Sequence, residues 1–456
     1  MKSISNKLLL TGIAGIISIS SFGQLTFDGE YRPRAEYRHG YKVDADTNQA
    51  SAFHISQRAR LNVGYKVDDY EFCISVQDVR VWGANPQLNV SDGFLSVHQA
   101  WGKINFNKNL GLKLGRQEII LDDHRIFGNV GWTQQARSHD AAVIQYEKGK
   151  MKLHVGLAFN QTTNKLGALS GVDYMLAKSY RDMHYAWFNY KVSDKITTSL
   201  LFLNLGNQSF DTLASGVQND AMYYTQTLGT HTKFNFGKLK MVFNGFYQMG
   251  SPQKTLTKHQ DKLSAYLIGL EANYAVTEKF KLGLGFEMQS GQSQTDTTSS
   301  YVKTNHAFTP FFGTNHKFNG LMDYFYVGSG HQNVGLNDAY LKIGYKLKKV
   351  TLGLNTHIFL AGNEVMDQVE FANSGEYKAM SSFLGTEFDF SIGFKINPSV
   401  SVKMGYSHML ASETLATLKG VTYTSGPDLG KGRTDQINNW AYTMIVIKPN
   451  FLKKKD

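Results

Sequence analysis

The 456-residue chain has one cysteine, Cys73, and no second thiol with which to form an internal disulfide. The fold therefore does not depend on oxidation, and Cys73 is expected to be a small wall residue. Beyond the N-terminus no apolar run approaches the roughly 20 residues that a membrane helix needs, which excludes helical membrane proteins. No Gly-rich phosphate loop opens a helix, and the basic residues are scattered, so no nucleic acid is expected as a partner.

The N-terminus has the composition of a secretory signal. Lys2 and Lys7 form a positive region, Leu8 to Ile19 an apolar one too short to span as a helix, and small residues precede a predicted cut near Gln24. No cysteine follows, so a lipoprotein anchor is not expected. We therefore predict a signal peptide over residues 1–23 and one domain over 24–456.

Most of the remaining chain alternates apolar and polar side chains. From Tyr266 to Val276, Phe280 to Met288 and Phe388 to Ile396, every second residue is apolar or aromatic, and most of the residues between are polar or Gly. A period of two with one apolar face predicts strands that meet water on one side and hydrocarbon or a core on the other.

The connections decide between a soluble sandwich and a membrane barrel, because short turns alternate strictly with long polar loops. The short turns are Val67–Tyr70, Asn107–Asn109, Glu147–Met151, Ser193–Lys195, Phe236–Lys238, Thr277–Lys279, Lys348–Lys349 and Asn397–Ser399. The long loops are His39–Ile55, Gly83–Phe94, Asp122–His139, Gln161–Met183, Gly206–Thr225, Gly250–Lys262, Gly291–Gly335, Ala361–Thr386 and Ala411–Asn439. This rhythm predicts an all-β chain that forms a single transmembrane antiparallel β-barrel of about 18 strands, with about 16 as the alternative. Turns would be periplasmic and loops extracellular in a bacterial outer membrane.

Aromatic residues support this orientation, because many lie within a few residues of the short turns. They are Tyr65, Tyr70, Phe106, Tyr146, Tyr190, Phe236, Tyr274, Phe280, Tyr345 and Phe394. We interpret them as a girdle at the periplasmic interface.

Charges predicted to face the lumen concentrate in the first third of the chain. Alternation places Arg32 and Arg34 on one face of the first strand, and Arg58 and Arg60 on the inward face of the second. Acidic residues of the first strand, Asp28 and Glu30, share the inward face and should pair with some of these arginines. The excess arginines would make the lumen electropositive.

Two later strands break the alternation, because strict parity would carry Asp78, Arg80 and Arg116 onto the lipid face. An arginine there costs on the order of 2 to 4 kcal/mol near mid-bilayer. We expect a β-bulge near Gln77 and another at Gly115 to rotate these charges into the lumen. The alternative is that they lie beyond the hydrocarbon band.

The loop Asp122–His139 carries Arg125 and Arg137, and Lys103 lies on a preceding strand. If the loop folds inward, it would narrow the pore and line it with cations that hold an anionic polymer. Alternatively, the arginines only hold the wall together by pairing with acidic residues. Those residues are Asp78, Glu118, Asp122, Asp123 and Asp140.

The stretch Leu114–Tyr146, LGRQEIILDDHRIFGNVGWTQQARSHDAAVIQY, resembles the alginate export family of outer-membrane barrels. The matching positions are Gly115, Arg116, Arg125, Trp132, Arg137 and Asp140. The segments RPRAEYR, RARLNVGYK and QDVRVWG also look like the family's first strands. The resemblance covers Leu25–Asn160 well, and the rest only in strand count and loop rhythm.

The resemblance implies an Arg-lined pore that passes an anionic polyuronate outward. The predicted substrate path is Arg32, Arg34, Arg58, Arg60, Arg80, Lys103, Arg116, Arg125 and Arg137, and its acidic partners are Asp28, Glu30, Asp78, Glu118 and Asp140. Expected partners are outer-membrane lipid, lipopolysaccharide and a periplasmic secretion or synthesis complex, with no metal or other cofactor. Lumenal charges in the C-terminal two thirds, such as Glu271 and Glu387, are acidic as often as basic. A diffusion porin for small solutes or oligosaccharides therefore stays open.

An outer-membrane lipid hydrolase is a second class of function. His54 and Ser56 would share one face, but no third catalytic residue is evident. Alternation splits the adjacent residues Ser138 to Asp140 between faces, so they cannot form a triad alone. The longest loop holds His306, His316 and His331 without the spacing of a metal site. We predict that the chain is not an enzyme.

Overall fold

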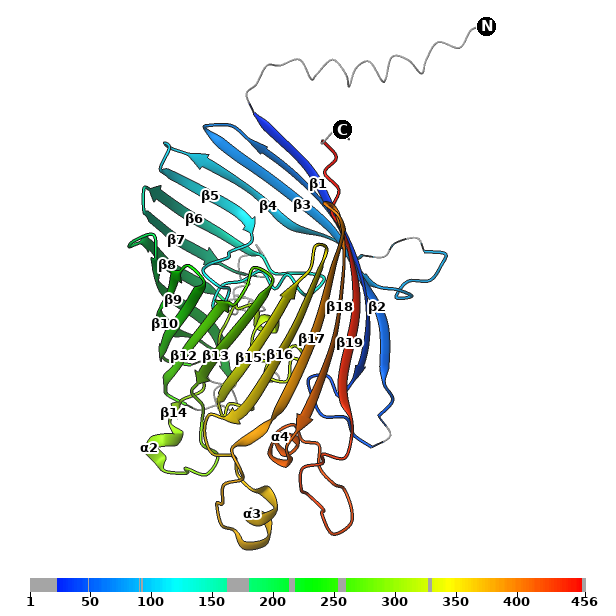
Figure 1. Ribbon diagram of the computed structural model, residues 1–456. Helices are drawn as coiled ribbons and strands as arrows, with labels where there is room; N and C mark the ends of the chain where they lie inside the picture. The colour runs from blue at the N-terminus through cyan, green and yellow to red at the C-terminus, as the bar shows by residue number, and fades with distance from the viewer. Residues whose placement is uncertain are drawn as a thin grey trace.

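A computed structural model describes residues 23–47, 49–89, 91, 93–161, 180–212, 218–252, 260–326 and 330–452. Its strands form one antiparallel sheet that closes on itself, because β1 pairs with both β2 and β19 (Figure 1). The short strand β14 (Thr304–Asn305) pairs in parallel with the start of β12 and does not cross the wall. The other 18 strands form the barrel, as predicted. The predicted signal peptide lies almost wholly outside the described residues and stays a prediction.

The barrel strands follow one another around the wall in chain order. They are β1 (Gln24–His39), β2 (Ala52–Lys66), β3 (Tyr70–Val81), β4 (Leu95–Asn105), β5 (Leu110–Gln117), β6 (His139–Lys148), β7 (Met151–Phe159), β8 (Asp182–Lys191), β9 (Ile196–Thr212), β10 (Gln218–Phe236), β11 (Leu239–Gly250), β12 (Lys262–Ala275), β13 (Phe280–Gln289), β15 (Leu336–Lys346), β16 (Val350–Ala361), β17 (Phe383–Asn397), β18 (Val400–Ala411) and β19 (Asn438–Ile447).

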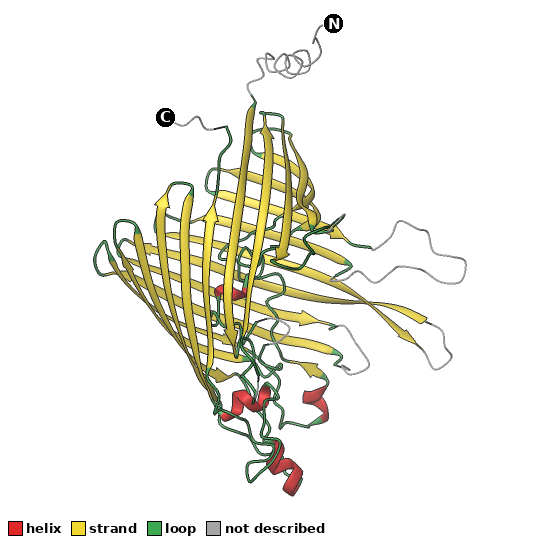
Figure 2. Cartoon of the chain, turned by 90° about the vertical axis from the view of Figure 1, so that its right-hand side faces the viewer, coloured by secondary structure: helices red, strands yellow, loops and turns green. Residues whose placement is uncertain are grey.

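Short turns join the strands at one end of the barrel and long loops at the other. Both described chain ends lie at the short-turn end, and the helices lie at the loop end, except for one short segment inside the barrel (Figure 2). These helices are α2 (Ser299–Val302), the 3-10 turn η1 (Asn315–Lys317), α3 (Gln368–Ser374) and α4 (Glu413–Leu418). All eight predicted short turns are present. The predicted loop Gly206–Thr225 is wrong, because Thr212 still pairs with Gln218 in an extension of the β9–β10 hairpin.

The outward faces of the strands are apolar, as alternation predicted. On β12, Ile268 and Leu270 are 49% and 46% exposed, and on β13 Leu284 is 64% exposed. Their neighbours Leu267 and Glu287 face inward and are buried. Because opposite residues of an antiparallel pair share a face, the register assigns each lumenal side chain. No helix in the described residues has the length and apolar character needed to cross a bilayer.

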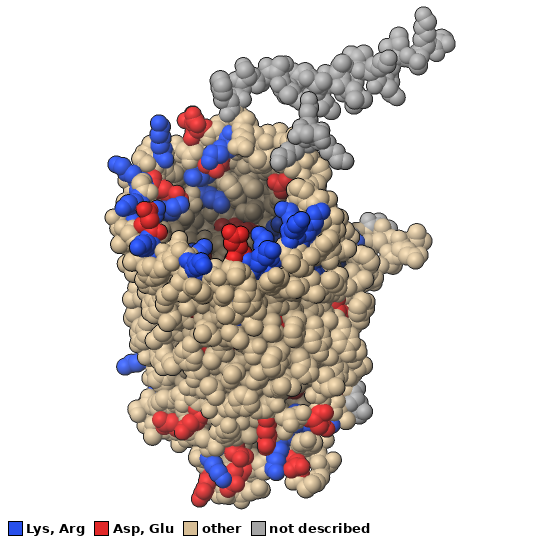
Figure 3. All heavy atoms as spheres, in the orientation of Figure 1, with Lys and Arg blue, Asp and Glu red and all other residues tan. Residues whose placement is uncertain are grey.

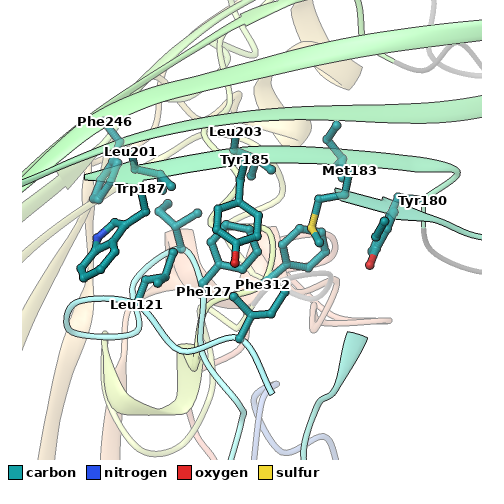
Figure 4. Packing of buried hydrophobic residues seen from close by; sticks show 14 of the residues in the cluster. Leu121, Phe127, Tyr180, Met183, Tyr185, Trp187, Leu201, Leu203, Phe246 and Phe312 are labelled. Atoms are coloured by element: carbon teal, nitrogen blue, oxygen red, sulfur yellow. The ribbon is translucent and has the colours of Figure 1, made fainter. Parts of the chain in front are cut away.

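The lumen at the loop end is filled by two inward-folded loops. We call residues 118–138 loop L3 and residues 290–335 loop L7. Phe127 of L3 and Phe312 of L7 pack on each other and against Tyr185 of β8, in a buried apolar cluster that also includes Leu203 of β9 (Figure 4). A second cluster joins Tyr324 of L7 to the walls of β16–β19 and to α4. The sequence left open whether the loop after β5 folds inward; L3 does so, and L7 accompanies it.

Candidate functional site

Four arginines form one patch on the lumenal face of β1 and β2. Arg32 stands directly opposite Arg58, and Glu30 opposite Arg60. Arg32, Arg34 and Arg58 are almost fully buried. Alternation predicted this inward face. We call these four residues the arginine wall.

The arginine wall binds L3. Arg32 donates to the backbone carbonyl oxygens of Gly131 at 2.7 Å and Thr133 at 2.8 Å. Arg34 donates to the Trp132 carbonyl at 2.6 Å and stacks over its ring. Arg58 donates to Glu30 and to the Gln134 carbonyl. Three of the four arginines therefore tie the loop to the wall, and each does so through backbone carbonyls of L3.

L3 and L7 are joined across the lumen. The Gly128 N–H donates to the Phe312 carbonyl at 2.8 Å, and Arg137 donates to the Gly313 carbonyl at 3.2 Å. Arg125 of L3 is ion-paired with Glu287 of β13 and donates to the side chain of Asn319 of L7. Arg125 therefore connects L3 to both L7 and the barrel wall, and Arg137 connects L3 to L7.

A buried acidic wall holds L7 on a neighbouring part of the barrel wall. Its members are Glu287, Asp338, Glu387 and Asp389, on β13, β15 and β17. Asn319 donates to Glu287 and Asp338 at 3.0 and 3.1 Å, and the Met322 N–H donates to Glu387 at 2.8 Å. These carboxylates therefore anchor L7.

The predicted bulges at Gln77 and Gly115 are wrong. Asp78 and Arg80 pair opposite Ala59 and Gln57 without a register shift, which leaves both on the outward face, where they form an ion pair. Arg80 lies one residue from the loop end of β3, so the alternative of a position near the strand end describes it better. The bulge lies across the sheet instead, where β4 has one extra residue, His98, between the partners of Ser75 and Val76.

Arg116 also stays on the outward face. It stands opposite Asp140, and their side chains pair at 2.9 Å. Gly115 has φ +116° but no register shift, so parity continues and Ile119 is buried inside rather than placed on the wall. Glycine absorbs this backbone distortion without rotating the strand.

Lys103 lies away from L3. It faces the lumen near the short-turn end of β4, with its Nζ 3.6 Å from Glu71. Among the predicted acidic partners, Asp28 accepts from Asn62 at 2.7 Å, and Glu30 binds Arg58. Glu118 begins L3 and binds His98 at 2.7 Å. Burial opposes ionisation of Glu118, but hydrogen bonds from His98 and Asn129 hold its pKa below the usual range.

A ring of lysines lines the lumen at the short-turn end, and the sequence prediction missed it as a set. Lysines and arginines surround the hollow at this end (Figure 3). The lumenal positions, by register and ion pairs, are Lys66, Lys103, Lys113, Lys152, Lys191, Lys233, Lys240, Lys281, Lys342, Lys346, Lys395, Lys403 and Lys448. We call this set the lysine belt.

Few carboxylates balance the lysine belt. Glu71, Glu147 and Glu271 each pair with one or two of its members. Six exposed members have no carboxylate within 4.0 Å in the described part of the chain: Lys233, Lys240, Lys281, Lys346, Lys395 and Lys403. Such a mouth attracts anions. Alternation alone put Lys66, Lys281 and Lys395 on the polar face, but their gathering appears only once the strands form a ring.

The predicted rival chemistries find no support in these contacts. The ring of His54 lies 3.6 Å from Glu36, and Ser56 accepts from Gln134 at 3.0 Å. Both face the lumen, away from the lipid that a hydrolase would attack. His316 stacks on Trp132 and binds Asp323. Among the described residues no cluster of three His, Cys, Asp or Glu side chains could hold a metal ion.

Comparison with solved structures shows the same architecture in outer-membrane channels. OccK8 (OprE) of Pseudomonas aeruginosa aligns with a TM-score of 0.57 and 11% identity over 94% of this chain and 99% of that one. OccAB1 of Acinetobacter baumannii aligns with a TM-score of 0.59 and 10% identity over 94% and 97%. At these identities the likeness concerns the fold.

The sequence comparisons add the family. Among curated proteins none matches the chain significantly. The family model described as alginate export matches residues 23–425, which is most of the chain. With the barrel fold, this match places the protein in the outer membrane as a porin-like channel. The chain belongs to the alginate export family of outer-membrane β-barrels.

Proposed function

We propose that the protein is an anion-selective channel that passes an anionic polysaccharide, of the alginate-like polyuronate class, across the outer membrane. The lysine belt is the observation that carries this proposal. Its unpaired ammonium groups face the water of the periplasmic mouth, where a polymer made in the cell arrives. A charged mouth with low-dielectric walls concentrates counter-ions and speeds their entry.

The lysine belt suits a moving polymer better than a bidentate arginine site would. Lysine is a flexible point charge that is strongly hydrated, so it attracts carboxylates without holding one geometry. Spread over most strands, the belt would let successive carboxylates exchange partners as the chain advances. The arginine wall would then act deeper in the lumen, at the contact with L3.

Blockade of single-channel current tests the proposal. Oligouronates of increasing length, added on the periplasmic side, should interrupt the current for times that grow with length, while neutral oligosaccharides of equal length should not. The variant Lys233→Gln/Lys281→Gln/Lys403→Gln should need at least about tenfold more oligouronate, because three unpaired charges are gone. Arg116→Gln, on the outer face, is the matched control and should behave as wild type. Equal blockade by neutral and anionic chains would contradict the proposal.

The alternative is a diffusion porin for small solutes or oligosaccharides, and the inward folding of both L3 and L7 favours it. The oligouronate series distinguishes the two functions, because a small-solute pore would pass the shortest uronates and give no length-dependent blockade. A periplasmic secretion or synthesis complex remains an expected partner of the short-turn end.

A further inference from the structure

Arg32 is a buried cation whose hydrogen-bond partners are neutral. It is 7% exposed and donates to the carbonyls of Gly131, Trp132 and Thr133 and to the side chain of Gln134. The carboxylate paired with it, Glu30, is 3.8 Å away, beyond hydrogen-bond distance. The L3 backbone therefore fills a place that an anion would fill better, because charge-assisted hydrogen bonds are about twice as strong as neutral ones.

The nearby carboxylates already have other cations. Glu30 is bound by Arg58 and by Lys448 at 3.2 Å. Glu36 is bound by Arg34 at 2.7 Å and Arg38 at 2.8 Å. The arginine wall therefore keeps an excess of positive charge.

A cavity of about 510 Å³ opens directly beside Arg32. Its lining runs from Lys448 of the lysine belt, past Arg32, Arg58 and Arg60, to Gly131 of L3. Amide side chains of Asn62, Gln99 and Asn129 also line it, together with three carboxylates that are outnumbered by the four cations: Asp28, Glu30 and Glu118. The volume lies within the usual range for small-ligand sites, and amides and arginines are suitable partners for sugar hydroxyls and carboxylates.

L3 is held in a strained conformation. Val130 has φ +49° and Ala136 φ +56°, a region in which a β-branched residue is rarely found. Such conformations persist only while surrounding contacts enforce them. The hydrogen bonds from the arginine wall are among those contacts, so losing them favours movement of L3.

We propose that this cavity binds one carboxylated sugar unit, a hexuronate, and that its carboxylate replaces the Gly131 and Thr133 carbonyls on Arg32. L3 residues 131–134 then leave the wall, and the polymer widens its own passage along β1 and β2. This inference rests on the proposed function and adds a binding site and a trigger to it.

The first test uses monomeric hexuronate, which is too short to block the pore. Added from the periplasmic side, it should raise the wild-type single-channel current at least about twofold, and a neutral hexose should not. Arg32→Gln should show the raised current without hexuronate and no further rise. Arg38→Gln is the matched control, because Arg38 lies on the same face of β1 but binds Glu36 and Tyr41 rather than L3.

The second test locks L3 in the native fold. In a Cys73→Ala background, Ser56→Cys and Gln134→Cys are bridged by a short reversible thiol cross-linker, since the native side chains touch at 3.0 Å. The bridged protein should not respond to hexuronate, and reduction should restore the response.

An equal response in the bridged and reduced proteins, or no hexuronate response in wild type, would overturn the binding site. The proposed function would survive either result if oligouronates still block the current. If oligouronates fail to block as well, the proposed function fails and takes this inference with it.

Discussion

Gly320 of L7 lies against the acidic wall. Its φ is +84°, and a Cβ there would lie 2.6 Å from a carboxylate oxygen of Glu387. The neighbouring Met322 N–H donates to the same carboxylate. A side chain at position 320 therefore requires the Glu387 carboxylate, and with it the anchor of L7, to move.

Gly320→Ala should release the tip of L7. We expect the Met322 amide to exchange with solvent at least about tenfold faster, because the substitution adds a steric clash to a left-handed strain of about 1 kcal/mol. Gly426→Ala is the control, since Gly426 has φ +87° and nothing within 4 Å of the added Cβ. Unchanged exchange at Met322 in Gly320→Ala would show that L7 is not anchored this way.

Asp44, in the long loop between β1 and β2, makes that loop sensitive to pH. Burial raises its pKa from 3.8 to about 6, against hydrogen bonds from Tyr324 and Asn438 and the charge of Lys419. An acid with a raised pKa in the folded state stabilises that state when protonated. The stabilisation of the folded state by protonated Asp44 is complete below about pH 4 and is lost as the pH rises through about 6.

Asp44→Asn should remove this loss. Hydrogen exchange of the Ala45 amide, which donates to Asn438 at 2.7 Å, reports opening of the loop between β1 and β2. Wild type and variant should be equally protected near pH 4, and the variant should be better protected above pH 6, by up to ~3 kcal/mol for a shift of about two pKa units. A difference that shrinks as the pH rises would contradict the assignment.

Prediction of the face on which a residue lies succeeded where strict alternation holds. It failed at the two places where we expected a β-bulge to turn a charge inward. Arg32 and Arg58 face the lumen because β1 and β2 are regular. Arg80 and Arg116 were assigned inward to avoid a cost in lipid, but each pairs with an adjacent carboxylate on the outer face. Nothing in the sequence of β3 shows that the extra residue lies in β4, because a bulge is a property of two strands.

At the scale of the strand, the cost of a lysine substitution depends on the face of the wall that carries it. Leu284→Lys puts a charge on the lipid face and should lower the free energy of unfolding by ~2 to 4 kcal/mol. Val242→Lys, opposite Glu271 on the lumenal face, should cost much less. Urea unfolding from lipid bilayers measures both. Equal losses would contradict the assigned faces.

The loops show what alternation cannot supply. The charges of L3 showed what an inward fold of that loop would do, but the sequence left open whether it folds inward. It did not predict that L7 joins it, because the joint depends on contacts such as the Gly128 N–H with the Phe312 carbonyl, far apart in the chain. The buried role of Glu287 and Glu387 was hidden for the same reason, since alternation gives a side but not what covers it.

At the scale of the whole molecule, the lysine belt places positive charge at the short-turn mouth of the barrel, and the arginine wall lies deeper in the lumen. Strand count and turn positions followed from the rhythm of turns and loops. The lysine belt did not, because its members are spread from Lys66 to Lys448 and become neighbours only when the barrel closes.

The reversal potential across a potassium chloride gradient tests the central claim, that the lysine belt makes this channel select anions. Wild type should pass chloride over potassium by at least about threefold, and Lys233→Gln/Lys281→Gln/Lys403→Gln should lose most of that preference, while Arg116→Gln keeps it. Cation selectivity in wild type, or anion selectivity unchanged in the triple variant, would contradict the account.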